Sequence, residues 1–153
     1  MWRGVFKHKQ ADIPIQFLIN GNNELIVKND DEFLTFNAAE TKGDSMVYES
    51  AFFSSSFILA TVNDSTLEGR WVNKKRDIPQ SISVQASSNI PYRFKPGEKP
   101  QVDISGQHKF LFLDDSGTPV ETNILKLKQN NFILTGSLLT ETGDYRFLEG
   151  VVR

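Results

Sequence analysis

Apolar and polar residues alternate with a period of two along most of this chain. In residues 13–19 the odd positions are all apolar, which places Ile13, Ile15, Phe17 and Ile19 on one face of a strand. No window long enough for a helix sustains the spacing of an apolar helical face without an interrupting turn residue. The pattern therefore predicts an antiparallel all-β fold.

Short polar turns separate the predicted strands. They are rich in Asn, Asp and Gly, which tolerate left-handed backbone conformations and bond to their own turn amides. About twelve strands are expected: one at the N-terminus, then 13–19, 24–29, 32–37, 45–50, 57–62, 66–73, 81–87, 104–113, 120–129, 132–140 and 145–152.

A proline-rich segment interrupts the pattern at residues 89–103. It holds three prolines, which do not fit a central strand, so we expect a crossover there. The crossover separates a first β-meander at 1–88 from a second at 104–153. The two meanders are compatible with a lipocalin-like barrel or with a β-sandwich. The chain begins and ends abruptly at predicted strands, so we expect it to be a fragment of a longer protein.

A weak internal repeat relates parts of the chain. Duplication and chance similarity between meanders both explain it. The matching positions are Gly4 with Gly69, Phe6 with Trp71, Lys9 with Lys74, 12–14 with 77–79, and the tripeptide 67–69 with 148–150.

Composition agrees with a soluble globular protein. The 153 residues, 39% hydrophobic and 24% charged, suit one domain or two small ones, and twelve Phe supply a large core. The absence of cysteine excludes disulfides, thiol redox chemistry and Cys-based zinc sites in this chain.

Charge disfavours nucleic acid binding, and the short apolar stretches predict no transmembrane segment. A net charge of −2 gives no attraction to phosphate backbones, and the basic cluster at 74–76 is short and followed by Asp77. The longest apolar stretches, such as 56–62, fall far below the roughly 20 residues of a membrane-spanning helix. No signal-peptide pattern stands at the start of the chain.

No catalytic, cofactor or metal site is predicted. His8 and His108, both expected in strands, lack partners at metal-ligand spacing, and most carboxylates occupy turns, where they cap amides. A glycosidase-like acid pair is the less favoured alternative. Residues 54–56 lack a nucleophile elbow, and 114–117 form a hairpin turn and not a calcium loop.

The adjacent aromatics Phe52 and Phe53 are the one candidate contact surface. They cannot both point inward on a regular strand. Either a bulge lets them fill the core, or they form an apolar contact surface for a ligand or a neighbouring domain.

Several motifs, in this order, resemble the β-rich N-terminal region of TlpA-like thiol-disulfide oxidoreductases of the Bacteroidetes lineage. The resemblance spans nearly the whole chain. It rests on Trp2-Arg3-Gly4, Pro14-Ile15-Gln16-Phe17, Gly43-Asp44-Ser45, Ala51-Phe52-Phe53-Ser54-Ser55, Leu67-Glu68-Gly69-Arg70-Trp71, Ile104-Ser105-Gly106 and the run at 142–150.

The resemblance implies a periplasmic or otherwise exported protein with a following thioredoxin-fold domain that carries the redox cysteines. It also implies that the second meander is incomplete and continues beyond Arg153. This chain would then be a non-catalytic accessory domain, which docks to that domain or presents substrates to it near Phe52 and Phe53. The alternative is lipocalin-like binding of a small apolar ligand. A carbohydrate-active β-protein, based on Trp2, Trp71 and scattered acids, is the third hypothesis.

Overall fold

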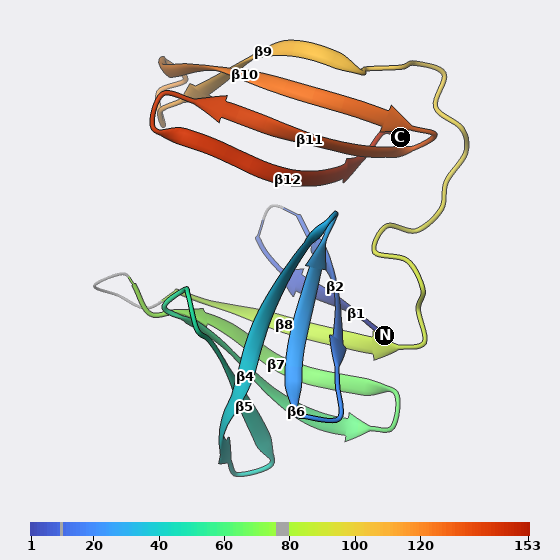
Figure 1. Cartoon of the computed structure of the whole chain (residues 1–153), viewed down its shortest axis with the longest axis vertical. Helices are drawn as coiled ribbons and strands as arrows, with labels where there is room; N and C mark the ends of the chain where they lie inside the picture. The colour runs from blue at the N-terminus through green and yellow to red at the C-terminus, as the bar shows by residue number, and fades with distance from the viewer. Residues whose placement is uncertain (10, 76–79) are drawn as a thin grey trace. The chain divides into compact units, whose positions relative to one another are not determined.

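The computed structural model describes residues 1–9, 11–75 and 80–153, and in these ranges the chain forms strands and no helix (Figure 1). This confirms the predicted all-β fold. The repeat segment 77–79 and Arg76 of the basic cluster lie outside the described residues. The strands are β1 (Trp2–Lys7), β2 (Ile13–Ile19), β3 (Glu24–Asn29), β4 (Glu32–Lys42), β5 (Ser45–Ser50), β6 (Ser55–Asn63), β7 (Thr66–Asn73), β8 (Gln80–Ser88), β9 (Gly106–Leu113), β10 (Pro119–Asn130), β11 (Ile133–Thr140) and β12 (Gly143–Val151).

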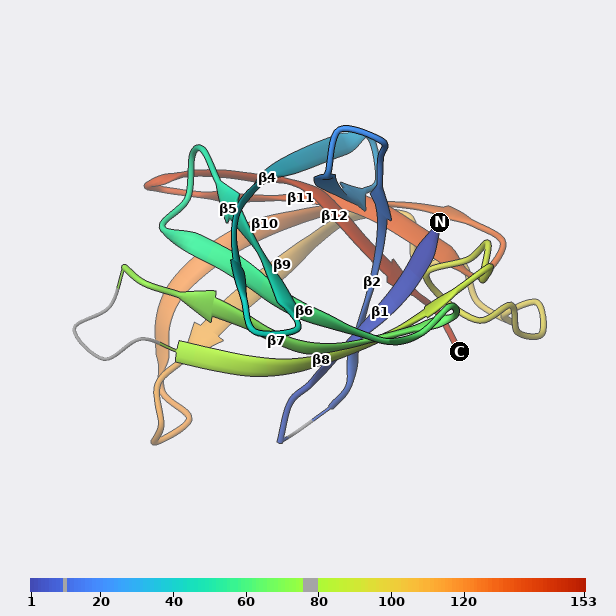
Figure 2. The same ribbon diagram turned by 90° about the horizontal axis from the view of Figure 1, so that it is seen from below.

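Strands β1 to β8 form a closed barrel in which each strand lies next to its neighbours in sequence (Figures 1 and 2). Antiparallel pairing of β1 with both β2 and β8 closes it: Trp2 lies opposite Phe17 on one side and Ser88 on the other. Of the two architectures left open by the sequence, the first meander therefore adopts the barrel.

Strands β9 to β12 form a separate four-stranded antiparallel sheet in the order β12-β11-β10-β9. By contacts the chain divides into two units: Met1–Lys28 with Phe33–Arg93, and Asn29–Glu32 with Phe94–Arg153. The division after Arg93 falls inside the proline-rich segment.

Several turn residues adopt the left-handed conformation that the sequence predicts for them. Asn23, Asp30 and Asn131 have φ angles of 57°, 53° and 55°. They stand in the turns that follow β2, β3 and β10. Asn and Asp reach this region more readily than other non-glycine residues, which explains their place in these tight connections.

The barrel core is a cluster of interior side chains that fills the middle of the barrel. Phe17 is fully buried, and its ring lies 6.4 Å from Phe57, which packs edge-on against Phe36 at 5.0 Å. Ile13, the first residue of β2, is 45% exposed, whereas Ile15 and Phe17 farther along the strand are buried. The buried members are Ile15, Phe17, Leu25, Phe36, Tyr48, Phe57, Leu59, Leu67, Val84 and Ala86.

Strands β6 and β7 approach closely at Gly69. A Cβ atom at this position would stand 1.9 Å from the carbonyl oxygen of Ile58. Only glycine fits such a contact between two backbones. The matching tripeptide ends at Gly150, where a Cβ would meet nothing within 4 Å.

Candidate functional site

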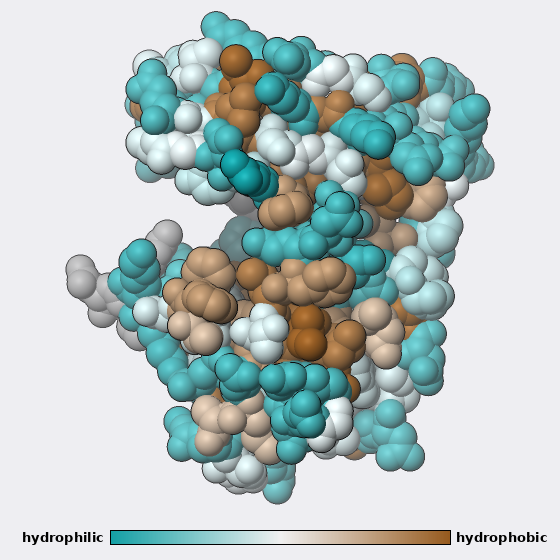
Figure 3. Space-filling view, in the orientation of Figure 1, coloured by the Kyte–Doolittle hydropathy of each residue, from teal (hydrophilic) through white to brown (hydrophobic). Residues whose placement is uncertain are grey.

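A cavity of about 410 Å³ lies at one end of the barrel. Strands β1, β3 and β7 end there, and β4 and β6 begin there, because neighbouring strands of an antiparallel meander run in opposite directions. Figure 3 shows hydrophobic side chains, brown to tan, gathered on the barrel face in this view. Six aromatic, two aliphatic and four polar residues line the cavity: Phe6, Phe36, Phe52, Phe53, Phe57, Trp71, Val27, Leu34, Ser54, Ser55, Asn73 and Lys75.

The turn between β5 and β6 places Phe52 and Phe53 at this cavity. The hydroxyl oxygen of Ser50 accepts hydrogen bonds from the backbone N–H groups of Phe52 and Phe53, at 3.3 and 3.0 Å. Phe52 is 87% exposed and Phe53 56% exposed. Neither fills the core at a bulge, and both are exposed beside the cavity.

The aromatic wall continues inward from the rim. Phe6 stacks on Phe57 with ring centroids 6.0 Å apart, and it meets Trp71 at 6.1 Å in a tilted arrangement. Phe57 is buried and separates the cavity from the packed middle of the barrel. These rings present a continuous apolar surface to anything that enters.

Polar groups occupy another part of the lining. The backbone N–H of Lys74 donates to the carbonyl oxygen of Ser54 at 2.6 Å, which joins the segment after β7 to the turn before β6. The backbone N–H of Lys75 donates to Oδ1 of Asn73 at 3.0 Å. Of the described residues that line the cavity, Lys75 is the only charged one, and none is a carboxylate.

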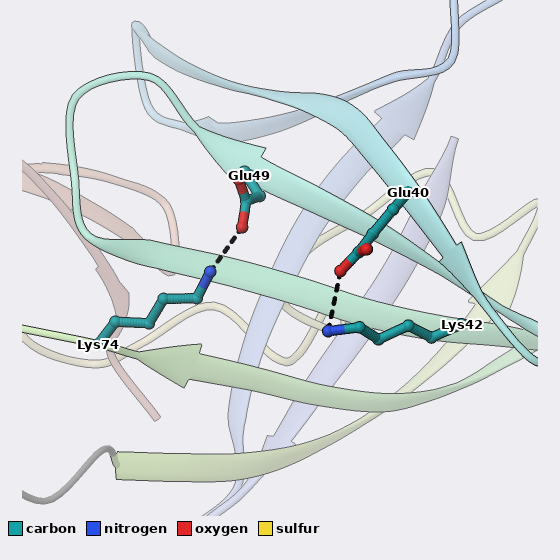
Figure 4. Close-up of polar contacts among 4 residues, drawn as sticks. All are labelled: Glu40, Lys42, Glu49 and Lys74. Carbon is teal, nitrogen blue, oxygen red and sulfur yellow. Dashed lines mark hydrogen bonds and ion pairs between the residues drawn. The ribbon is translucent and has the colours of Figure 1, made fainter.

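An ion pair crosses strand β6 close to this rim (Figure 4). The ammonium of Lys74 lies 2.5 Å from Oε1 of Glu49 on β5. The hydrogen bond from Lys74 lowers the pKa of Glu49 below its ordinary value. Figure 4 also shows Lys42 with Glu40, at 2.8 Å on β4.

The other candidate groups do not join this site. His8 is exposed just beyond β1, so its expected place in a strand is wrong, while His108 lies in β9 with Nε2 2.8 Å from the carbonyl oxygen of Ile104. The carboxylate of Asp114 accepts hydrogen bonds from the N–H groups of Ser116 and Thr118, each at 2.9 Å, as a hairpin turn requires. Within the described ranges, no three His, Asp or Glu side chains gather as metal ligands.

Two further cavities are less suited to an apolar ligand. One of about 680 Å³ is lined mostly by the proline-rich residues of the second unit, and one of about 350 Å³ lies at the opposite end of the barrel. Neither is lined by a cluster of aromatic rings like that of Phe6, Phe57 and Trp71. The described ranges contain no helix with the length and apolarity to cross a membrane.

Comparisons with protein-family models, with curated proteins and with solved structures find no match for this chain. The site is therefore interpreted from its own chemistry. The sequence predicts a contact surface at Phe52 and Phe53, but that prediction does not include Phe6, Trp71 or Lys75. The repeat that aligns Phe6 with Trp71 was the available signal, because both rings face the same cavity.

Proposed function

We propose that the barrel is a binding module for a small apolar ligand, which enters the cavity beside Phe52 and Phe53. The observation that carries the proposal is an open cavity of about 410 Å³ whose lining is two-thirds apolar by residue. Ligand pockets commonly measure about 300 to 1,000 Å³ and combine an apolar wall with few polar groups.

The exposure of the rim supports this function. Two large aromatic side chains stand in water although burial of each would gain roughly 1.5 to 3 kcal/mol. Both belong to a short turn and not to a strand, so they can adjust around a ligand without disturbing the ladder between β5 and β6. A ligand that covers them removes apolar surface from water and gains affinity.

The test is a fluorescence titration with N-phenyl-1-naphthylamine, a neutral apolar probe that becomes bright in apolar surroundings. We expect saturable binding that weakens about tenfold or more in a Phe52→Ser, Phe53→Ser double variant, because part of the apolar contact is lost. Phe33→Ser is the matched control, since Phe33 is 61% exposed on β4 and does not line the cavity.

Two results would overturn the proposal. One is the absence of saturable probe binding to the folded wild-type protein. The other is an equal loss of binding in the Phe33→Ser control, which would show that the probe adheres to exposed aromatics in general.

The resemblance to TlpA-like proteins supports a second candidate: an accessory domain of an exported thiol-disulfide oxidoreductase that docks to a thioredoxin-fold domain of the same polypeptide. The exposure of Phe52 and Phe53 favours it, because a protein surface can also cover such side chains. The coding sequence downstream of Arg153 tests it. A Cys-x-x-Cys thioredoxin pattern there is expected, and an immediate stop codon in an intact genome contradicts this candidate.

A further inference from the structure

Each polar residue of the cavity lining can donate hydrogen bonds. Lys75 contributes an ammonium group, and Ser54 and Ser55 contribute hydroxyls. Asn73 uses its Oδ1 to accept the N–H of Lys75, which leaves its amide N–H groups as donors. A group that accepts several hydrogen bonds and carries negative charge matches this set.

Of the two neighbouring lysines at the rim, Lys75 lines the cavity and Lys74 pairs with Glu49. Lys74 is bound twice, by its N–H to Ser54 and by its ammonium to Glu49, and the pair is neutral as a unit. The ammonium of Lys75 forms no ion pair with any described carboxylate. A ligand anion would therefore meet a positive charge that no described carboxylate pairs with.

We propose that the ligand of this cavity is an organic acid, with a compact apolar body against the rings of Phe6, Phe57 and Trp71 and its carboxylate at Lys75. The inference rests on the proposed function, which it deepens by naming the ligand class. A charge-assisted hydrogen bond to a carboxylate is roughly twice as strong as a neutral one, so the acid group also fixes the orientation of the ligand.

The opposite charge fits this cavity poorly. An aromatic wall alone can attract a cation through its ring faces. Such a site gains from a nearby carboxylate, and the described lining holds none, while Lys75 would repel the cation. The sign of the one charge thus selects an anion.

The experiment is isothermal titration calorimetry with 2-naphthoate and its neutral isostere 2-naphthamide at low and high salt. At low salt we expect the acid to bind about three to ten times more tightly than the amide. Lys75→Gln should bring the two affinities together by weakening the acid alone. Added salt should narrow the difference in the wild type, because Lys75 is solvent-exposed.

Lys42→Gln is the matched control, since it removes the same charge from β4 outside this cavity. It should preserve the preference for the acid. Equal affinity of acid and amide, or a preference that survives Lys75→Gln, would overturn the inference while leaving apolar binding intact. Failure of both compounds and of the neutral fluorescent probe would instead remove the proposed function itself.

Discussion

Replacement of Gly69 by alanine is the most direct test of the barrel geometry. The added methyl group would lie 1.9 Å from the carbonyl oxygen of Ile58, whereas Cβ contacts below 3.0 Å essentially do not occur. The neighbouring atom belongs to the backbone of β6, so no side-chain rotation relieves the clash. Strands β6 and β7 must separate locally by about 1 Å.

The separation of β6 and β7 lowers stability because it strains the core packing and stretches hydrogen bonds between the two strands. Overpacking a well-packed interior costs about 1 to 3 kcal/mol, and each ladder hydrogen bond that is stretched adds about 0.5 to 1.5 kcal/mol. The contact lies at the register pair of Gly69 with Leu59, a buried core residue. We therefore expect Gly69→Ala to lower the free energy of unfolding by about 2 to 4 kcal/mol.

Urea unfolding followed by tryptophan fluorescence measures this change, because both tryptophans, Trp2 and Trp71, belong to the barrel unit. Alanine substitutions at two other glycines serve as comparisons for the loss of stability. Gly4→Ala should cost less than Gly69→Ala, because its Cβ would meet side-chain atoms of Ile15 and Phe17, at 2.8 and 3.0 Å, and no backbone atom at such a short distance. Gly21→Ala has open space and should be neutral or slightly stabilising, since alanine restricts the unfolded chain.

An unfolding free energy of Gly69→Ala within about 0.5 kcal/mol of the wild type would refute the close approach of β6 and β7. The second copy of the tripeptide, at residues 148–150, provides a comparison for the substitution at Gly69. Gly150→Ala, assayed by amide hydrogen exchange in β11 and β12, should leave protection unchanged, because nothing lies within 4 Å of the new methyl group.

Three further predictions concern the core, the rim and the second sheet. Phe17→Ala should lower the free energy of unfolding by about 3 to 5 kcal/mol in the same urea assay, because the ring is fully buried; a much smaller loss would contradict a filled barrel. Glu49→Gln should lower the melting temperature at neutral pH but not in acid. Lys74 lowers the pKa of Glu49 in the folded state, so the ionised carboxylate contributes to stability above the ordinary pKa of 4.5, and this contribution is lost as the pH falls through the folded-state pKa. A difference from the wild type that persists in acid would show that charge is not its cause. Asp114→Ala should increase amide exchange in the hairpin of β9 and β10, because the carboxylate accepts the turn N–H of Ser116; unchanged exchange would rule out this capping role.

The strands were predictable because period-two alternation and turn residues determine most of them. At two strand boundaries, the end of β4 and the start of β6, the alternation is missing and the prediction differs from the structure. Strand β4 continues to Lys42, five residues beyond the predicted end. Residues 38–42 pair with β5 around a bulge, although two alanines followed by three polar residues show no alternation. Strand β6 begins at Ser55, where a serine run of low strand preference is held by pairing with Asn73.

The candidate site was predictable only in part. The pair Phe52-Phe53 is conspicuous in sequence because neighbouring aromatics cannot share one face of a strand. Trp71 and Lys75 come from a segment about twenty residues later, which the hairpin of β6 and β7 brings beside this turn. Phe6 lies on β1, and only the closure of the barrel brings it next to Trp71. Closure depends on the pairing of β1 with β8, a long-range contact that no local pattern encodes.

The packed middle of the barrel limits what its aromatic end can bind. Phe17 and Leu25 are fully buried, and Phe57 is nearly so, which separates the two end cavities. The opposite end is lined by residues such as Met46 and Tyr48, and burial raises the pKa of the Tyr48 hydroxyl, which stays neutral at physiological pH. If the proposed ligand binds at the Phe52–Phe53 end, this packed middle prevents it from threading through the barrel, which favours a compact ring system over a long acyl chain.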